Sequence, residues 1–302
     1  MSFATRWRMA SSALVLALAA AGAAQAQGGG WQPFVSVTPV YQGSADLDGG
    51  GDVGAWSAYV RAGVLGDIGG GNRAGVTFNY DYTDYSFSNP AAFGGVAPWN
   101  AVRRYGASAP LAFNLGEGWF LGIAPSVDWI HETGADESES INWGGFVSAT
   151  RFFPGGNRIG VGVGVFQRIE KTSVFPVLLI DWKLGDRWRL VNPLPAGPTG
   201  PAGLELDYRL DGGWNIGIGA AWRTTRFRLS ETGPVPNGIG EERGVPVFLR
   251  ASSGVGRGVS LSLYAGVVTA GQLRIETPSG AGLREVDLDP QLLLGVTISA
   301  RH

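Results

Sequence analysis

The residues of this chain that could do chemistry are chiefly arginines and carboxylates, and many occupy every second position of otherwise apolar stretches. Glu205, Asp207 and Arg209, for example, alternate with leucines and a tyrosine. A period of two sends successive side chains to opposite faces of a β-sheet. Charges of both signs on one face suit either a polar pathway for a solute or a set of ion pairs that stiffens the wall.

Twelve charged residues are expected on this polar face. They are Arg61, Asp81, Arg104, Asp128, Arg168, Asp181, Lys183, Glu205, Asp207, Arg209, Arg223 and Arg250. A charge on a lipid-facing strand position costs about 2–4 kcal/mol at the bilayer midplane. The charged face is therefore expected to line the lumen of a closed barrel, and the apolar face to meet lipid.

A basic cluster ends one of these stretches. Alternation predicts that Arg223 points inward, while Arg226 and Arg228 share the opposite face. The cluster suits contact with anions or lipopolysaccharide phosphates, because guanidinium groups make forked, charge-assisted hydrogen bonds. A solvated rim is the alternative.

Two acidic loops are candidate cation sites. Asp46, Asp48 and Asp52 have spacing that resembles a calcium loop, but position 57, where the bidentate glutamate would stand, is serine. Residues 136–139 form a second acidic stretch, which could bridge to anionic lipids through divalent cations. We expect solvated acidic loops and no resident metal.

Catalysis has one candidate base. Serine hydrolysis needs a nucleophile beside a base, and the two histidines are His131 and the terminal His302. His131 lies near Ser138, but no recognised nucleophile signature surrounds it. We expect no catalytic residue and no cofactor; the G-x-G-x-G at 160–164 has no helix after it and is no nucleotide signal. A lipid-acting enzyme using His131 remains an alternative.

Fourteen alternating stretches predict an all-β, transmembrane, up-and-down antiparallel barrel. Twelve strands is the alternative, because the stretch at 188–193 is short and runs into prolines. The expected strands are 31–42, 55–67, 73–86, 101–115, 119–131, 141–153, 158–169, 174–184, 188–193, 201–210, 214–229, 243–253, 258–270 and 288–301. Short connectors alternate with longer ones, such as 43–54, 86–100 and 271–287, which are expected to be free outer loops.

Aromatic residues gather near the ends of these stretches. Amphipathic rings favour the lipid headgroup level, so two girdles are expected. Their members are Trp31, Trp119, Trp188, Trp214, Tyr41, Tyr85, Trp129 and Trp222.

The N-terminus has the form of an export signal. Arg6 and Arg8 precede a short apolar run, and small residues end at Ala26. We expect a signal peptide at 1–26 and one barrel domain at 27–302, located in the outer membrane of a Gram-negative bacterium. Cysteine is absent, which excludes disulfides and thiolate chemistry, and no basic stripe indicates nucleic acid.

The stretch F-P-V-L-L-I-D-W-K-L-G-D-R-W-R-L-V-N-P at 175–193, with 200–210 and 214–229, resembles a family of uncharacterised Gram-negative exported proteins. That family looks like outer-membrane barrels distantly similar to channels of aromatic-degradation pathways. The resemblance implies fold and location and supplies no substrate. The terminal strand is similar to the signal read by the barrel-insertion machinery, although it ends in histidine.

These observations predict a porin-like channel that passes a small polar or amphipathic solute, passively or with weak selectivity. The other expected partners are outer-membrane lipid and lipopolysaccharide. A closed structural or surface-interaction barrel is the runner-up.

Overall fold

The computed structural model describes residues 30–193, 202–256 and 258–301. The expected signal peptide at 1–26 lies outside the described residues. The chain forms sixteen strand segments and two short 3-10 helices, η1 (Ala91–Phe93) and η2 (Glu137–Glu139). The strand segments are β1 (Trp31–Asp46), β2 (Asp52–Gly69), β3 (Asn72–Ser88), β4 (Ala101–Ser108), β5 (Leu111–Gly116), β6 (Trp119–Glu132), β7 (Ile141–Phe152), β8 (Arg158–Arg168), β9 (Lys171–Lys183), β10 (Trp188–Val191), β11 (Ala202–Arg209), β12 (Trp214–Arg228), β13 (Ile239–Gly256), β14 (Val259–Glu276), β15 (Gly282–Leu288) and β16 (Gln291–Arg301).

Two pairs of segments are single strands interrupted at a proline. β4 and β5 pair with β3 in one continuous register across Ala109 and Pro110. β15 and β16 likewise continue one register along β14 across Asp289 and Pro290. Proline cannot donate a ladder hydrogen bond, which explains both interruptions. The fold is thus an antiparallel barrel of fourteen strands, as the sequence predicts.

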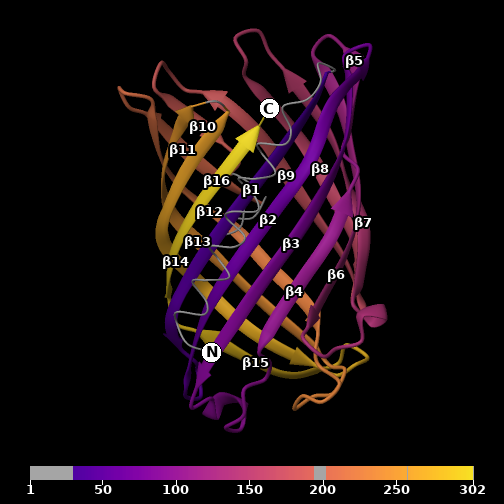
Figure 1. Ribbon diagram of the computed structural model, residues 1–302, viewed down its shortest axis with the longest axis vertical. Coiled ribbons are helices and arrows are strands. Elements are labelled where there is room, and N and C mark those ends of the chain that lie inside the picture. The colour runs from indigo at the N-terminus through magenta and orange to yellow at the C-terminus, as the bar shows by residue number, and fades with distance from the viewer. Residues whose placement is uncertain (1–29, 194–201, 257, 302) are drawn as a thin grey trace.

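The barrel closes by pairing β1 with β16, and each strand otherwise pairs with its neighbour in the chain (Figure 1). Short turns join the strands at one end, the turn end, where β16 finishes (top of Figure 1). The longer connections, η1, η2 and β15 lie at the opposite end, the loop end.

The outer face of the barrel is apolar and exposed. Val161 pairs with Leu178 of the adjacent strand, and their side chains are 66% and 44% exposed. Trp143, Phe78 and Leu249 are exposed on the same outer face. An apolar surface that encircles a barrel is the form that a lipid-facing wall takes.

The expectation of free loops at 43–54 and 271–287 is wrong. β1 and β2 continue to Asp46 and from Asp52, while β14 and β15 form a hairpin whose connection is only residues 277–281. These stretches have backbone partners along most of their length, so they extend the wall beyond the region that the sequence predicts.

The extended strands build a narrower ring at the loop end, which we call the neck. It consists of the loop-end parts of β1, β2, β3, β4, β6, β12, β13, β14 and β15. Leu288 of β15 bridges to Leu47 beside β1. On the other side, Arg228 of β12 pairs in parallel with His131 of β6, so β12 crosses above the ends of β7–β11. Nine strands close the neck, whereas fourteen close the barrel between the neck and the turn end.

The wall beneath this crossing is not fully paired in the described residues. β10 pairs with β9 only at residues 181–183, so β9 residues 171–179 pair only with β8. Asn192 directly follows the short strand, and its side chain hydrogen-bonds Ile180 and Leu178 of β9 and Gly203 of β11. The amide thus links the two strands on either side of β10.

Among the described residues no helix is long and apolar enough to span a bilayer.

Candidate functional site

The lumen contains a first charged network on β2, β3, β4 and β6. Arg61 forms a forked ion pair with Asp81, and Arg104 forms a second one with Asp128 at 3.0 Å for both hydrogen bonds. Arg104 also lies 3.8 Å from Asp81, which links the two pairs. Asn79 donates a 2.9 Å hydrogen bond to Asp128. Every charge in this network has an opposite partner.

A second network lies on β11 and β13. Arg250 Nε donates to Glu205 at 2.6 Å, and its Nη2 donates to both carboxylate oxygens of Asp207 at 2.9 and 3.0 Å. The intervening strand β12 has Gly217 at this level. A Cβ there would lie 2.0 Å from Glu205 Oε1, so only glycine leaves room for the carboxylates to reach Arg250.

A third group lies toward the turn end. Arg189 donates two hydrogen bonds to Asp181, at 2.5 and 2.6 Å, and Arg158 lies 3.6 Å from the same carboxylate. These three residues come from three consecutive strands.

On the loop-end side of these networks, hydrogen bonds cross the lumen. Arg223 of β12 donates to Gln42 of β1 at 3.0 Å and to Glu242 of β13 at 2.9 Å. Tyr85 of β3 donates to the same glutamate, and Gln42 donates to Gln291 at 2.7 Å. Opposite walls are therefore tied together just below the neck.

The neck has an apolar interior. Trp99 is 1% exposed and makes edge contacts with Tyr85, Phe87 and Phe227. The interior of a barrel of about eight strands is just filled by its own side chains, and nine strands close this ring. The other buried members of the cluster are Leu47, Val53, Ala55, Ala92, Val102, Ile130, Leu229, Leu273, Ile275 and Val286. The neck is therefore closed by packed side chains.

The outer side of β12 in the neck is covered by ion pairs. Arg226, 1% exposed, donates to Glu276 at 2.5 Å and to the carbonyl oxygen of Ile169 at 2.7 Å. Arg228 donates to carbonyl oxygens of Glu139 and Asn237. As alternation predicts, both arginines face away from Phe227 and Leu229. They form neither a rim in solvent nor a cluster with Arg223.

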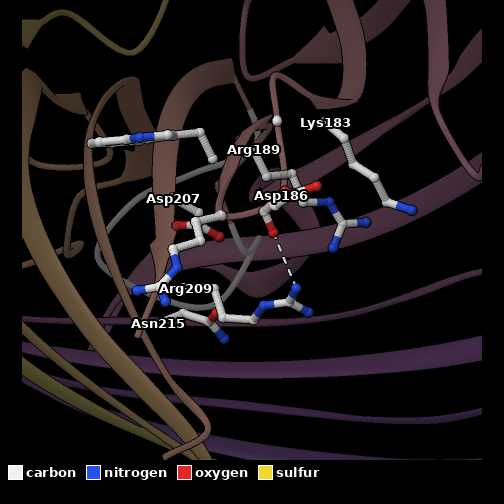
Figure 2. A pocket seen from close by; sticks show the side chains of 9 residues that line it. Lys183, Asp186, Arg189, Asp207, Arg209 and Asn215 are labelled. Atoms are coloured by element: carbon white, nitrogen blue, oxygen red, sulfur yellow. Dashed lines mark hydrogen bonds between the residues drawn. The ribbon is translucent and has the colours of Figure 1, made fainter. Parts of the chain in front are cut away.

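A pocket of about 440 Å³ opens at the turn end, on the side of the charged networks away from the neck (Figure 2). Lys183 donates to the carbonyl oxygen of Gly155 at 2.7 Å, and Arg209 donates to that of Asp186 at 3.0 Å. Figure 2 shows the second bond as a dashed line. The pocket is lined by Lys183, Gly185, Asp186, Arg187, Trp188, Arg189, Asp207, Arg209 and Asn215.

The predicted lumen residues lie in the charged networks, at the turn-end pocket and near the neck. Arg61, Asp81, Arg104, Asp128, Glu205, Asp207 and Arg250 form the first two networks, and Asp181 forms the third. Lys183 and Arg209 lie at the turn-end pocket. Arg223 lies just below the neck, and Arg168, at the loop end of β8, interacts electrostatically with Glu241. Whether they line a solute route stays a prediction.

One girdle assignment needs correction. Tyr85 is buried in the neck interior, because it lies four positions after Asp81 on β3 and therefore shares its inward face. Six of the other girdle residues are exposed: Trp31, Trp119, Trp188, Trp214, Tyr41 and Trp222. Trp129 is half-buried and stacks on Tyr105.

Several partners were missed by sequence reasoning. Arg189 and Arg158 neutralise Asp181, and their alternation within β10 and β8 was a usable signal. Glu241, Glu242 and Glu276 fell in stretches expected to be loops, so no periodicity pointed to them.

The two acidic stretches have different surroundings. Asp52 accepts a hydrogen bond from Ser44 at the start of β2. Asp136 caps η2, where the backbone N–H and hydroxyl of Ser138 donate to it and lower the pKa of its carboxyl. His131 packs edge-on against Tyr105, and its Nδ1 lies 3.0 Å from the carbonyl oxygen of Glu132. In the described residues no group of three or more potential metal ligands is found.

The fold and lumen place this chain in the class of up-and-down antiparallel β-barrels. No protein-family description and no curated protein matches the sequence.

Solved barrels do resemble the structure, at low identity. The COG4313 outer membrane channel from Pseudomonas putida F1 is 12% identical, with a TM-score of 0.49, and 92% of this chain covers 97% of that one. The Pseudomonas putida toluene transporter TodX is 11% identical, with a TM-score of 0.38 and coverages of 91% and 90%. The translocator domain of autotransporter NalP from Neisseria meningitidis is 13% identical, with a TM-score of 0.35 and coverages of 97%. These neighbours include outer-membrane channels, the kind of protein that the sequence resembles, and they identify no solute here.

Proposed function

We propose that this protein is an outer-membrane channel for a small polar or amphipathic solute, and that the described conformation is its closed state. The observation that carries the proposal is the contrast within one barrel. A wide lumen with charged walls lies toward the turn end, and a narrow, packed neck lies at the loop end.

The apolar outer face supports a place in a bilayer, because exposed apolar surface of this extent is unfavourable in water. In outer-membrane barrels the short turns face the periplasm and the longer connections face outward. On that basis the neck projects outward and the turn-end pocket opens to the periplasm. Lipopolysaccharide is the proposed neighbour of the neck, and β16 is the proposed signal for the insertion machinery.

The lumen chemistry suits a polar solute. Most of its charges are held in ion pairs, so the wall keeps its shape; Lys183 and Arg209, at the turn end, donate to backbone carbonyl oxygens instead. Fourteen strands leave more interior space than the eight that side chains fill. The neck, by contrast, must loosen before a solute can pass.

Liposome swelling tests this proposal. Vesicles carrying purified, folded protein are diluted into isotonic arabinose, and the swelling rate is compared between the wild type and Trp99→Ala. We expect slow swelling for the wild type and a rate at least fivefold higher for the variant, because the truncation opens the neck. Equal rates at the protein-free background for both would exclude passage of a small polar solute.

A closed structural barrel is the second candidate, and the packed neck favours it. In that case loosening the neck changes stability and leaves permeability at the background. The swelling assay therefore separates the two functions.

A further inference from the structure

The turn-end pocket contains more positive than negative charge. Four of its lining residues are cations and two are carboxylates. Two of the cations are neutralised: Arg187 makes two hydrogen bonds to Asp211 and Arg189 makes two to Asp181. Of the lining carboxylates, Asp207 is already bound by Arg250.

Two cations remain. Within the described residues, neither Lys183 nor Arg209 has a carboxylate within 4.0 Å, and each side chain donates to a backbone carbonyl oxygen instead. Both line the same pocket from different strands (Figure 2). A carbonyl oxygen uses one donor of each group and cancels no charge, so further donors and the full positive charge remain for a ligand.

A neutral donor completes the set. Asn215 is the register partner of Arg209 and lines the same pocket. Its amide makes no hydrogen bond to the described residues. An ammonium, a guanidinium and an amide around one cavity are the donors that bind a carboxylate in proteins.

We infer that this pocket is an anion-binding site for a small organic monocarboxylate. The charge balance selects the class: two unneutralised cations and the remaining carboxylate of Asp186 leave one net positive charge, which matches a monoanion better than a dianion. The volume of about 440 Å³ falls in the range of pockets that hold small organic molecules. The inference rests on the proposed function for its role, since the site would hold the solute at the periplasmic exit of the lumen.

Binding can be measured without passage. The probe is 6,6,6-trifluorohexanoate, followed by ¹⁹F line broadening on detergent-solubilised, folded protein. The neutral control ligand is 6,6,6-trifluorohexanamide, which has the same chain and no charge. We expect saturable binding of the carboxylate, at least tenfold tighter than that of the amide, and weaker in higher salt because the attraction is electrostatic.

The variants are Lys183→Gln and Arg209→Gln, each expected to weaken carboxylate binding at least fivefold. Arg209→Lys keeps the charge and should retain most of the affinity, which separates charge loss from disturbance of the turn. Arg73→Gln is the matched control, because Arg73 is an exposed arginine at the same end of the barrel and outside the pocket. Heat-modifiable gel mobility verifies that each variant is folded.

Three outcomes overturn the inference: no saturable binding to the wild type, equal binding of the amide, or affinity unchanged in both glutamine variants. Inorganic phosphate at pH 8, bound more tightly than the carboxylate, would overturn the ligand class. If the carboxylate binds as expected and vesicles never swell, the site stands and the proposed channel function fails. If vesicles swell and no carboxylate binds, the channel stands without this site.

Discussion

Arg250 of β13 donates a 2.6 Å hydrogen bond to Glu205 of β11, although β12 lies between their two strands. Gly217 makes this contact possible, because any side chain on β12 at that level would occupy the space of the carboxylates. The same device occurs on the opposite wall, where Gly106 of β4 leaves room for Asn79 of β3 to reach Asp128 of β6. Inward glycines thus let polar and charged side chains pair across a whole strand.

Gly217→Ala should therefore destabilise the barrel. The new Cβ displaces Glu205 and Asp207 and leaves Arg250 buried without its partners, and breaking a buried ion pair costs about 3–5 kcal/mol. Urea unfolding in lipid vesicles, followed by tryptophan fluorescence, measures the loss. Gly254→Ala is the control, since a Cβ at that position meets no atom within 4 Å. Equal stability of the two variants would contradict the account of Gly217.

Asp128→Asn should shift the ion preference of the lumen. Arg104 loses its forked carboxylate partner and keeps only the 3.8 Å contact with Asp81, which already pairs with Arg61. The lumen becomes more positive by one charge, so the anion-to-cation permeability ratio should rise about twofold or more. Reversal potentials in a KCl gradient measure this ratio, best in the Trp99→Ala background. Glu117→Gln, in the exposed turn between β5 and β6, should leave it unchanged; a shift of the same size there would refute a lumen effect.

Much of the fold follows from alternation, and most of the neck does not. All fourteen strands were predictable, because a period of two and turn residues are local signals. Tyr85 was assigned to an aromatic girdle because it lies near the end of its strand, although it shares the inward face of Asp81. The neck depends on contacts between residues far apart in the chain, such as Arg228 with His131. No local sequence pattern predicts such pairing, and Glu276 was therefore assigned to a loop.

Glu276→Gln tests the outer side of the neck. Arg226 loses one of its two carboxylate partners and keeps Glu241 at 3.3 Å. The expected cost is up to about 3 kcal/mol, below the full range for an unpaired buried charge. Faster amide hydrogen exchange at Phe227, Leu229 and Ile239 would report the local opening. Glu285→Gln is the control, because Glu285 is an exposed partner of Arg243 and such pairs contribute about 0–1 kcal/mol.

The η2 turn should respond to acid. The folded pKa of Asp136 lies below its ordinary value of 3.8 because Ser138 donates two hydrogen bonds to the carboxylate. A depressed pKa means that the stabilisation is present above the unfolded pKa and is lost as pH falls through the folded one. Protection of the Ser138 amide, corrected for its intrinsic exchange rate, should fall as the pH is lowered from about 4 through the depressed folded pKa of Asp136. Ser138→Ala should raise the pKa of Asp136, whereas unchanged Ser138 protection across that range would remove the capping account.

The central claim is that a conducting lumen lies beneath a neck that closes it. Planar-bilayer conductance of Trp99→Ala, compared with the wild type, tests it most directly. The truncation should remove about 3–5 kcal/mol of packing. Leu273→Ala serves as a milder second neck variant, and Trp143→Ala, on the exposed outer face, is the control. We predict rare openings for the wild type and control, and frequent or sustained openings for both neck variants. Folded neck variants that never raise conductance above the lipid background would contradict it.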